Sequence, residues 1–242
     1  MGWPDCELIH RSALIAQPVN AWSSLAFALV CGWILVRALR GDHGRTPELV
    51  VFGLAVGVNA IGSFAYHGLR VGWGHWAHDM GIYAVLAFVA IHAFGTVRGW
   101  ARRNTLSAFA ASLAILGVLR WTIPGANDAI SGLLAGAAAV GELFAWRSGL
   151  RPRRSDELTV HLAAWTLALG AMALGCVSFL LGSKASPLCH PDSLFQWHAL
   201  WHVLQAVAMM AYAYAAVELW SPADAPEEAR RHLNGTPTAP TV

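Results

Sequence analysis

Seven long apolar runs, separated by short polar connections, limit what this chain can fold into more than any other feature. They extend over Val19 to Leu39, Leu49 to Leu69, His78 to Val97, Thr105 to Trp121, Ala129 to Trp146, Leu158 to Leu181 and Trp197 to Trp220. Only 12% of the 242 residues are charged, whereas a soluble domain carries about a quarter charged residues. Because backbone groups in lipid must bond within their own segment, apolar runs of this length indicate helices. The sequence therefore predicts an all-α membrane protein, a seven-transmembrane helix bundle.

One membrane domain accounts for nearly the whole chain. We expect the bundle to occupy residues 1–220, and residues 221–242, with four prolines among small and charged residues, to form a mobile cytoplasmic tail. The first 17 residues lack a continuous apolar core, so no cleaved signal peptide is expected. The formal net charge is only +2, which argues against a nucleic-acid partner. No feature of the sequence indicates an obligate protein partner.

The basic residues are divided unequally between the two sides of the predicted bundle. Twelve fall on one side: Arg37, Arg40, Arg45, Arg98, Arg102, Arg103, Arg147, Arg151, Arg153, Arg154, Arg230 and Arg231. Four fall on the other: Arg11, Arg70, Arg120 and Lys184. Because cytoplasmic loops carry the excess of Lys and Arg, we expect the N-terminus outside and the C-terminus in the cytoplasm. The Ala- and Arg-rich composition and short termini favour a bacterial inner membrane.

Five polar side chains fall at the outer ends of three predicted helices. Ser63 and His67 are four residues apart, so they share a face of the second helix. Asp79 lies just past an outer loop, and His198 and His202 lie in the first turns of the seventh helix, again four residues apart. Ionisable residues in a membrane are costly and usually mark a functional site. We therefore expect a site in this outer layer, on the periplasmic side.

The three histidines of this layer suit zinc. Three imidazoles and an open position are typical of a catalytic zinc site, and an i, i+4 pair supplies two ligands from one helix. The segment His198 to His202 resembles the two-histidine helix of the zincin proteases, except that Ala199 replaces their general-base glutamate. Asp79 is the best carboxylate at the right depth to accept a proton instead.

Several of these residues also have ordinary structural interpretations. Ser63 by itself fits a helix hydroxyl that bonds its own i−4 carbonyl, and Asp79 fits a helix cap. His75 and His78 flank the site and are either partners of its residues or, the interpretation we favour, interfacial belt residues beside Trp73 and Trp76. Glu142 and His161 are interpreted as structural partners of loop arginines.

Cys6 and Cys189 both fall on the outer side, where disulfides persist, whereas Cys31 and Cys176 lie within spans and are expected to be packing residues. A bridge between Cys6 and Cys189 would tie the N-terminal segment to the loop before the seventh helix. The alternative is two free interfacial thiols.

Several sequence blocks resemble the alkaline ceramidases, members of a seven-helix hydrolase superfamily that includes the adiponectin receptors. The blocks are Asp5-Cys6-Glu7, Gln17-Pro18-Val19-Asn20-Ala21-Trp22-Ser23, Gly62-Ser63-Phe64-Ala65-Tyr66-His67, His78-Asp79 and Gln196-Trp197-His198-Ala199-Leu200-Trp201-His202. The ordered pattern S-x-x-x-H, D, H-x-x-x-H covers the chain from about residue 5 to about residue 220.

The resemblance implies that His67, His198 and His202 bind Zn2+, that Asp79 handles the proton of the attacking water, and that Ser63 supports the metal site or the oxyanion. It implies hydrolysis of the amide of ceramide, a membrane lipid, to a sphingoid base and a fatty acid. The disulfide between Cys6 and Cys189 is likewise a family feature.

The resemblance fails at the family's calcium site. Glu7 and Asp5 are acidic here, but Pro4, Ile9 and Gln17 stand where the eukaryotic pattern has oxygen ligands of higher charge or number. Ca2+ favours several oxygen ligands, so we expect a depleted calcium site.

Three other functions compete with a ceramidase. A seven-helix receptor or channel would hold zinc structurally, and a hydrolase of the same mechanism would cleave another lipid amide or ester. A retinal protein is excluded, because the only lysine, Lys184, lies in a loop and not in the seventh span.

Overall fold

The computed structural model describes residues 5–40, 46–150 and 158–218, and within these ranges the chain is mostly helical. The helices are α1 (Pro18–Ser23), α2 (Leu25–Arg40), α3 (Thr46–Phe64), η1 (Ala65–Leu69), α4 (Gly74–Val97), α5 (Arg102–Thr122), η2 (Pro124–Ala126), α6 (Asn127–Arg147), α7 (Leu158–Leu181), α8 (Trp197–Tyr212) and η3 (Ala213–Glu218). Seven of the described segments are long and apolar enough to span a membrane, which confirms the predicted seven-helix bundle.

The predicted helix boundaries agree closely with those of the structure, and two differences matter. The third span starts at Gly74 and not at His78, so the first turn of α4 contains His75, a polar residue that the apolar pattern left in a loop. The last span continues from α8 into η3, whose described end is Glu218. The predicted end at Trp220 and the predicted tail lie outside the described residues.

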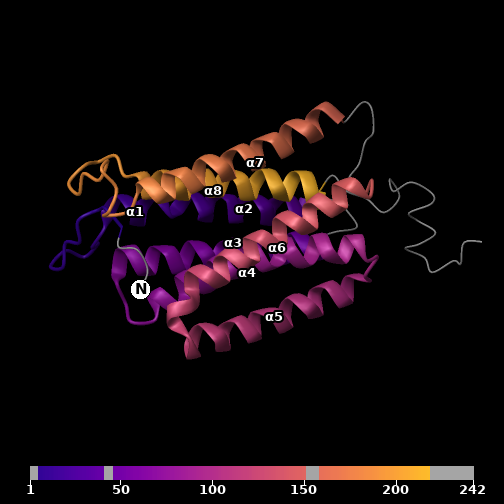
Figure 1. Cartoon of the computed structure of the whole chain (residues 1–242), viewed down its shortest axis with the longest axis horizontal. Coiled ribbons are helices and arrows are strands. Elements are labelled where there is room, and N and C mark those ends of the chain that lie inside the picture. Colours follow the sequence, from indigo (N-terminus) through magenta and orange to yellow (C-terminus); the bar gives the residue numbers. More distant parts are fainter. Residues whose placement is uncertain (1–4, 41–45, 151–157, 219–242) are drawn as a thin grey trace, which may run out of the picture.

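The middle of the bundle is formed by α3, α4 and α8, the most deeply buried of the spanning helices (Figure 1). Helix α4 packs against α3, α5 and α6, while α8 packs against α7 and α2. Helix α5 packs on α4 at the edge of the bundle, where most of its surface is open to lipid (Figure 1).

Two glycines allow α3 and α4 to come close together. A Cβ on Gly62 would lie 2.3 Å from the backbone oxygen of Ala77, and one on Gly81 would lie 2.5 Å from the Cα of Asn59. Small residues at helix contacts let backbones approach in membrane bundles. This close contact holds Ser63 of α3 beside the first turns of α4.

The N-terminal segment is fastened to the connection between α7 and α8 at one end of the bundle (Figure 1). Cys6 and Cys189 form a disulfide with a Cα to Cα distance of 5.4 Å, as predicted. The backbone N–H of Cys6 donates to the carbonyl of Gly182 at 2.8 Å, and Asp5 forms an antiparallel bridge with Ser183. The segment therefore covers the end of the bundle from which His198 and His202 project.

Candidate metal centre

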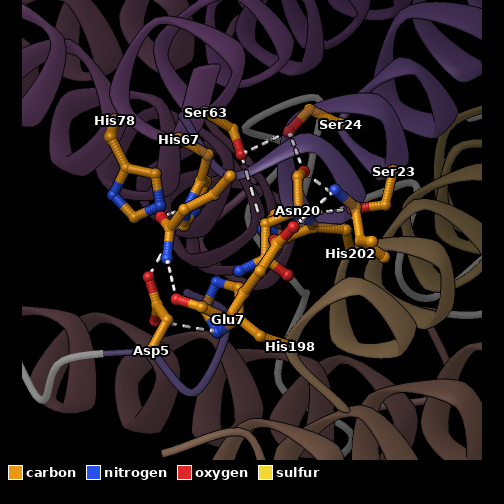
Figure 2. A network of polar contacts seen from close by, with 12 residues as sticks. Asp5, Glu7, Asn20, Ser23, Ser24, Ser63, His67, His78, His198 and His202 are labelled. Atoms are coloured by element: carbon orange, nitrogen blue, oxygen red, sulfur yellow. Dashed lines mark hydrogen bonds and ion pairs between the residues drawn. The ribbon is translucent and has the colours of Figure 1, made fainter. Parts of the chain in front are cut away.

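Three histidines meet at this end of the bundle. His67 comes from η1, and His198 and His202 come from the first turns of α8. All three are buried, and one ligand atom from each lies within 4.8 Å of the others. Figure 2 shows the three side chains gathered at this end of the bundle. The cluster that the sequence predicted is present, and among the described residues it is the group that has the spacing to hold a metal ion.

Local structure explains how the rings are brought together. His67 lies in a π-helical turn that continues α3, and such turns are frequent at functional sites. Arg70, at the end of this turn, has a φ of 49°, which reverses the chain toward α4. Before α8, the side chain of Gln196 donates to the carbonyl of Ser193 at 2.8 Å and fixes the turn from which His198 follows.

The Nδ1 atoms of His67 and His198 are held by acceptors from the N-terminal segment. The Nδ1 of His67 lies 3.0 Å from Oε1 of Gln17 and 3.4 Å from Oδ2 of Asp5. The Nδ1 of His198 lies 3.3 Å from Oδ1 of Asp5. Because an amide oxygen only accepts, the Nδ1 of His67 carries the hydrogen, whereas the Nδ1 of His198 lies at an ion-pair distance from the carboxylate.

The third histidine is oriented by α1. The Nδ1 of His202 lies 2.8 Å from Oγ of Ser23, and this hydroxyl donates its own hydrogen to the carbonyl of Asn20 at 2.8 Å. Ser23 must therefore accept from the Nδ1–H of His202. The Nδ1 contacts of His67 and His202 favour the tautomer in which Nε2 has a lone pair to offer, and the Nδ1 of His198 faces a carboxylate.

The Nε2 atoms are the part of the site that fits a metal. Those of His67 and His198 are buried and have no hydrogen-bond partner among the described residues. The Nε2 of His202 lies 3.4 Å from Oγ of Ser63. Leaving a buried polar atom unpaired costs about 1–3 kcal/mol. A metal ion bound by the three Nε2 atoms would remove this cost, and neutral imidazole is the form in which histidine binds zinc.

Ser63 lies beside the cluster as expected. Its hydroxyl is 2.8 Å from that of Ser24, which donates to the carbonyl of Asn20 at 3.1 Å. In this arrangement the hydrogen of Ser63 is directed to Ser24. Ser63 therefore bonds across to α1–α2 and contacts a histidine of the cluster (Figure 2).

Asp79 is next to the cluster but separated from it by a side chain. Its two oxygens are engaged by Arg120 of α5 and by Nδ1 of His78, which is 3.1 Å away. His75 is 3.5 Å from the same carboxylate. The ring of His78 packs against that of His67 with centroids 5.6 Å apart. Asp79 thus reaches the three histidines through His78.

Glu7 anchors the start of α1. Its two carboxylate oxygens accept hydrogen bonds from the backbone N–H groups of Val19 and Asn20, at 2.7 and 2.8 Å. Burial raises the pKa of the Glu7 carboxyl, and the two hydrogen bonds oppose this rise only in part. Both acidic residues of the N-terminal segment are therefore bound to donors of the protein, Glu7 to the backbone and Asp5 to histidines.

Sequence reasoning missed the residues that orient the site. Asp5 and Gln17 were considered only in the blocks and at the calcium site, Ser23 only as part of a block, Ser24 not at all, and Arg120 only as an outer basic residue. One signal was available, because polar residues at the start of the first helix share the outer side with the histidines.

The chain matches no model of a known protein family, and no curated protein resembles it closely enough to be a match. The resemblance to the alkaline ceramidases therefore stays a prediction. The chemistry of the site has to be argued from its own residues.

Proposed function

We propose that this protein is a zinc-dependent intramembrane amidohydrolase. Its proposed substrate is ceramide or a related N-acyl lipid, cleaved to a long-chain amine and a fatty acid. One observation carries the proposal: three buried imidazoles converge, their Nδ1 atoms lie beside acceptors of the protein, and the Nε2 atoms of His67 and His198 have no hydrogen-bond partner among the described residues.

His67, His198 and His202 would hold the zinc ion. When bound there, zinc supplies Lewis-acid polarisation of the amide carbonyl and activation of water. Structural zinc sites are usually closed by four protein ligands, whereas catalytic sites keep a position open. The cluster contains three ligand side chains from the described residues, which favours catalysis over the receptor or channel alternative.

Two neighbouring groups have the positions to assist amide cleavage. We assign the proton transfer to Asp79, which acts through His78: the carboxylate holds the Nδ1 of an imidazole that packs on His67. A positioned acid–base group contributes about 10²–10⁴ in rate. Ser63 would turn its O–H from Ser24 toward the oxyanion that develops on the carbonyl.

The surroundings of the cluster support a lipid substrate. A cavity of about 100 Å³ borders Asp5 and His198 and is lined on its other side by Phe179 and Leu180 of α7. Leu180 is 70% exposed on the outside of the bundle, where acyl chains would contact it. From the distribution of arginines, we place this end of the bundle on the periplasmic side of a bacterial inner membrane.

The test is hydrolysis by the purified protein in lipid nanodiscs. We expect long-chain N-acyl sphingoid substrates to release a fatty acid and a long-chain amine, with activity lost on chelation and restored by zinc. Mass spectrometry of a mixture of lipid amides and esters would identify the preferred class. Cleavage of esters alone would support the alternative hydrolase, and stoichiometric zinc without turnover on any lipid would support the structural alternative.

A further inference from the structure

A single carboxylate touches two of the three histidines. Oδ1 of Asp5 lies 3.3 Å from Nδ1 of His198, and Oδ2 lies 3.4 Å from Nδ1 of His67 (Figure 2). The side chain of Asp5 is only 12% exposed. Both of its oxygens face the side of the rings away from the point of convergence. Asp5 is therefore placed to orient ligands and not to be one.

The position of Asp5 is set by its neighbours in the chain. Cys6 is covalently tied to Cys189, and Asp5 itself forms an antiparallel bridge with Ser183. Glu7 is fastened to the first backbone N–H groups of α1. These anchors hold the backbone on both sides of the carboxylate to the α7–α8 connection and to α1. A carboxylate in a free N-terminal segment would lose conformational entropy each time it made the two contacts.

From these contacts we propose that Asp5 is a positioning residue of the metal centre, held in place by the Cys6–Cys189 disulfide. It keeps His67 and His198 in the tautomer and ring orientation that present Nε2 to the metal. This inference rests on the proposed zinc site but not on the reaction that the site catalyses. Carboxylates that accept from a ligand histidine fix its orientation and strengthen its donor nitrogen, and their loss costs about 10–100-fold in metal affinity.

The two histidines do not depend equally on Asp5. The Nδ1 of His67 is also 3.0 Å from Oε1 of Gln17, so a second acceptor holds that ring. Asp5 is the acceptor that lies at Nδ1 of His198. Loss of the carboxylate should therefore act mainly through His198, whose ring would be free to turn.

The test is the zinc affinity of the purified full-length protein, measured by competition with a chelator of known affinity. We expect Asp5→Asn to weaken binding by about 10–100-fold. Asp5→Glu keeps the carboxylate and should retain more affinity than Asp5→Asn. Asp192→Asn is the matched control, because Asp192 is exposed in the same connection between α7 and α8, and it should bind zinc like the unchanged protein.

A second variant separates orientation from general destabilisation. Glu7→Gln weakens the anchor of the same segment without touching a histidine, so it should lower the melting temperature of the metal-free protein more than it lowers zinc affinity. The double variant Cys6→Ser, Cys189→Ser should weaken zinc binding in the same direction as Asp5→Asn. With cobalt in place of zinc, Asp5→Asn should change the visible absorption bands, which report ligand geometry, while Glu7→Gln should leave them unchanged.

Three outcomes would overturn the inference. Unchanged zinc affinity in Asp5→Asn would show that the carboxylate does not position the ligands, while leaving the proposed zinc site intact. Equal losses of affinity in Asp5→Asn and Glu7→Gln, with unchanged cobalt spectra, would show a merely structural role. Failure of the unchanged protein to bind zinc would remove the proposed function together with this inference.

Discussion

Two of the groups of buried polar side chains inside the bundle differ in which of their atoms have hydrogen-bond partners. At the end covered by the N-terminal segment, the Nδ1 atoms of His67 and His198 lie beside acceptors, and their Nε2 atoms have no hydrogen-bond partner among the described residues. In the other group, Tyr212 of α8 donates to Glu142 of α6 at 3.1 Å and lies 3.3 Å from Nδ1 of His92 of α4.

The difference separates a binding site from a structural contact. Tyr212 has one hydrogen to donate and lone pairs to accept, so it can serve both neighbours and join α4, α6 and α8. The three site histidines instead have their Nδ1 atoms beside Asp5, Gln17 and Ser23, and one ligand atom of each lies within 4.8 Å of the others. Ionisable residues inside a membrane are functional candidates by default, and the first group is the one whose three histidines have the spacing to hold a metal ion.

Removal of two ligands is expected to have the largest effect. The double variant His198→Ala, His202→Ala should lose its zinc completely, because one imidazole cannot hold the ion. His92→Ala is the matched control, since it removes a buried histidine from the other group, and it should retain zinc. Elemental analysis of the purified proteins measures the zinc content of the double variant and of His92→Ala. Stoichiometric zinc in the double variant would show that the histidines at the covered end of the bundle are not the metal ligands.

Loss of Asp79 should separate metal binding from turnover. Asp79→Asn should keep zinc and slow lipid hydrolysis by about 10²–10⁴, because proton transfer loses its carboxylate. Asp128→Asn changes an exposed carboxylate in the first turn of α6 and should leave the rate unchanged. The measurement is zinc content beside the rate of fatty acid release. Full activity in Asp79→Asn would exclude its assigned role.

Arg120 should matter for stability, because it is the cation paired with Asp79. Both side chains are buried, 8% and 1% exposed, and removing one partner of such a pair costs about 3–5 kcal/mol. We expect Arg120→Met to lower the free energy of unfolding by this amount, and the double variant with Asp79→Asn to recover part of it. Arg103→Met, on an exposed position of the same helix, is the control. An unchanged stability in Arg120→Met would show that the pair contributes nothing.

In the group formed by Tyr212, Glu142 and His92, Tyr212→Phe removes the hydroxyl that joins α4 and α6 to α8. We expect a loss of about 1–3 kcal/mol in stability, the cost of disturbing buried hydrogen bonds. Zinc content should not change. Tyr214→Phe, two residues further along and half-buried, should have a smaller effect. A loss of zinc in Tyr212→Phe would mean that the two groups are coupled.

The smallest expected effect is a pH dependence due to Glu7. Because the pKa of Glu7 is raised in the folded protein, its contribution to stability is greatest below the ordinary value of 4.5 and is lost as the pH rises through the raised value. Melting curves of the metal-free protein from about pH 4 to pH 7 should show this loss, and Glu7→Gln should flatten that part of the profile. Identical profiles of melting temperature against pH for the unchanged protein and Glu7→Gln would show that Glu7 is not the group responsible for the pH dependence.

The features of the fold that depend on local pattern could be predicted from the sequence. Seven apolar runs specify seven helices because each must satisfy its backbone within itself. The spacing of His198 and His202 places them on one face of a helix in any fold that contains it. The disulfide between Cys6 and Cys189 followed from their common side of the predicted bundle together with the family resemblance.

What the tertiary structure alone decided are the contacts between segments far apart in the chain. His67 was expected in the site from its depth, but a π-helical turn sets the position of its ring, and apolar periodicity contains no signal for such a turn. Asp79 was expected beside the metal, but the packing of α5 on α4 gives its carboxylate to Arg120. Asp5 became a neighbour of two ligands because the disulfide brings the N-terminal segment over α8. A sequence pattern repeats with the geometry of one helix, whereas these contacts depend on how separate helices and loops pack together.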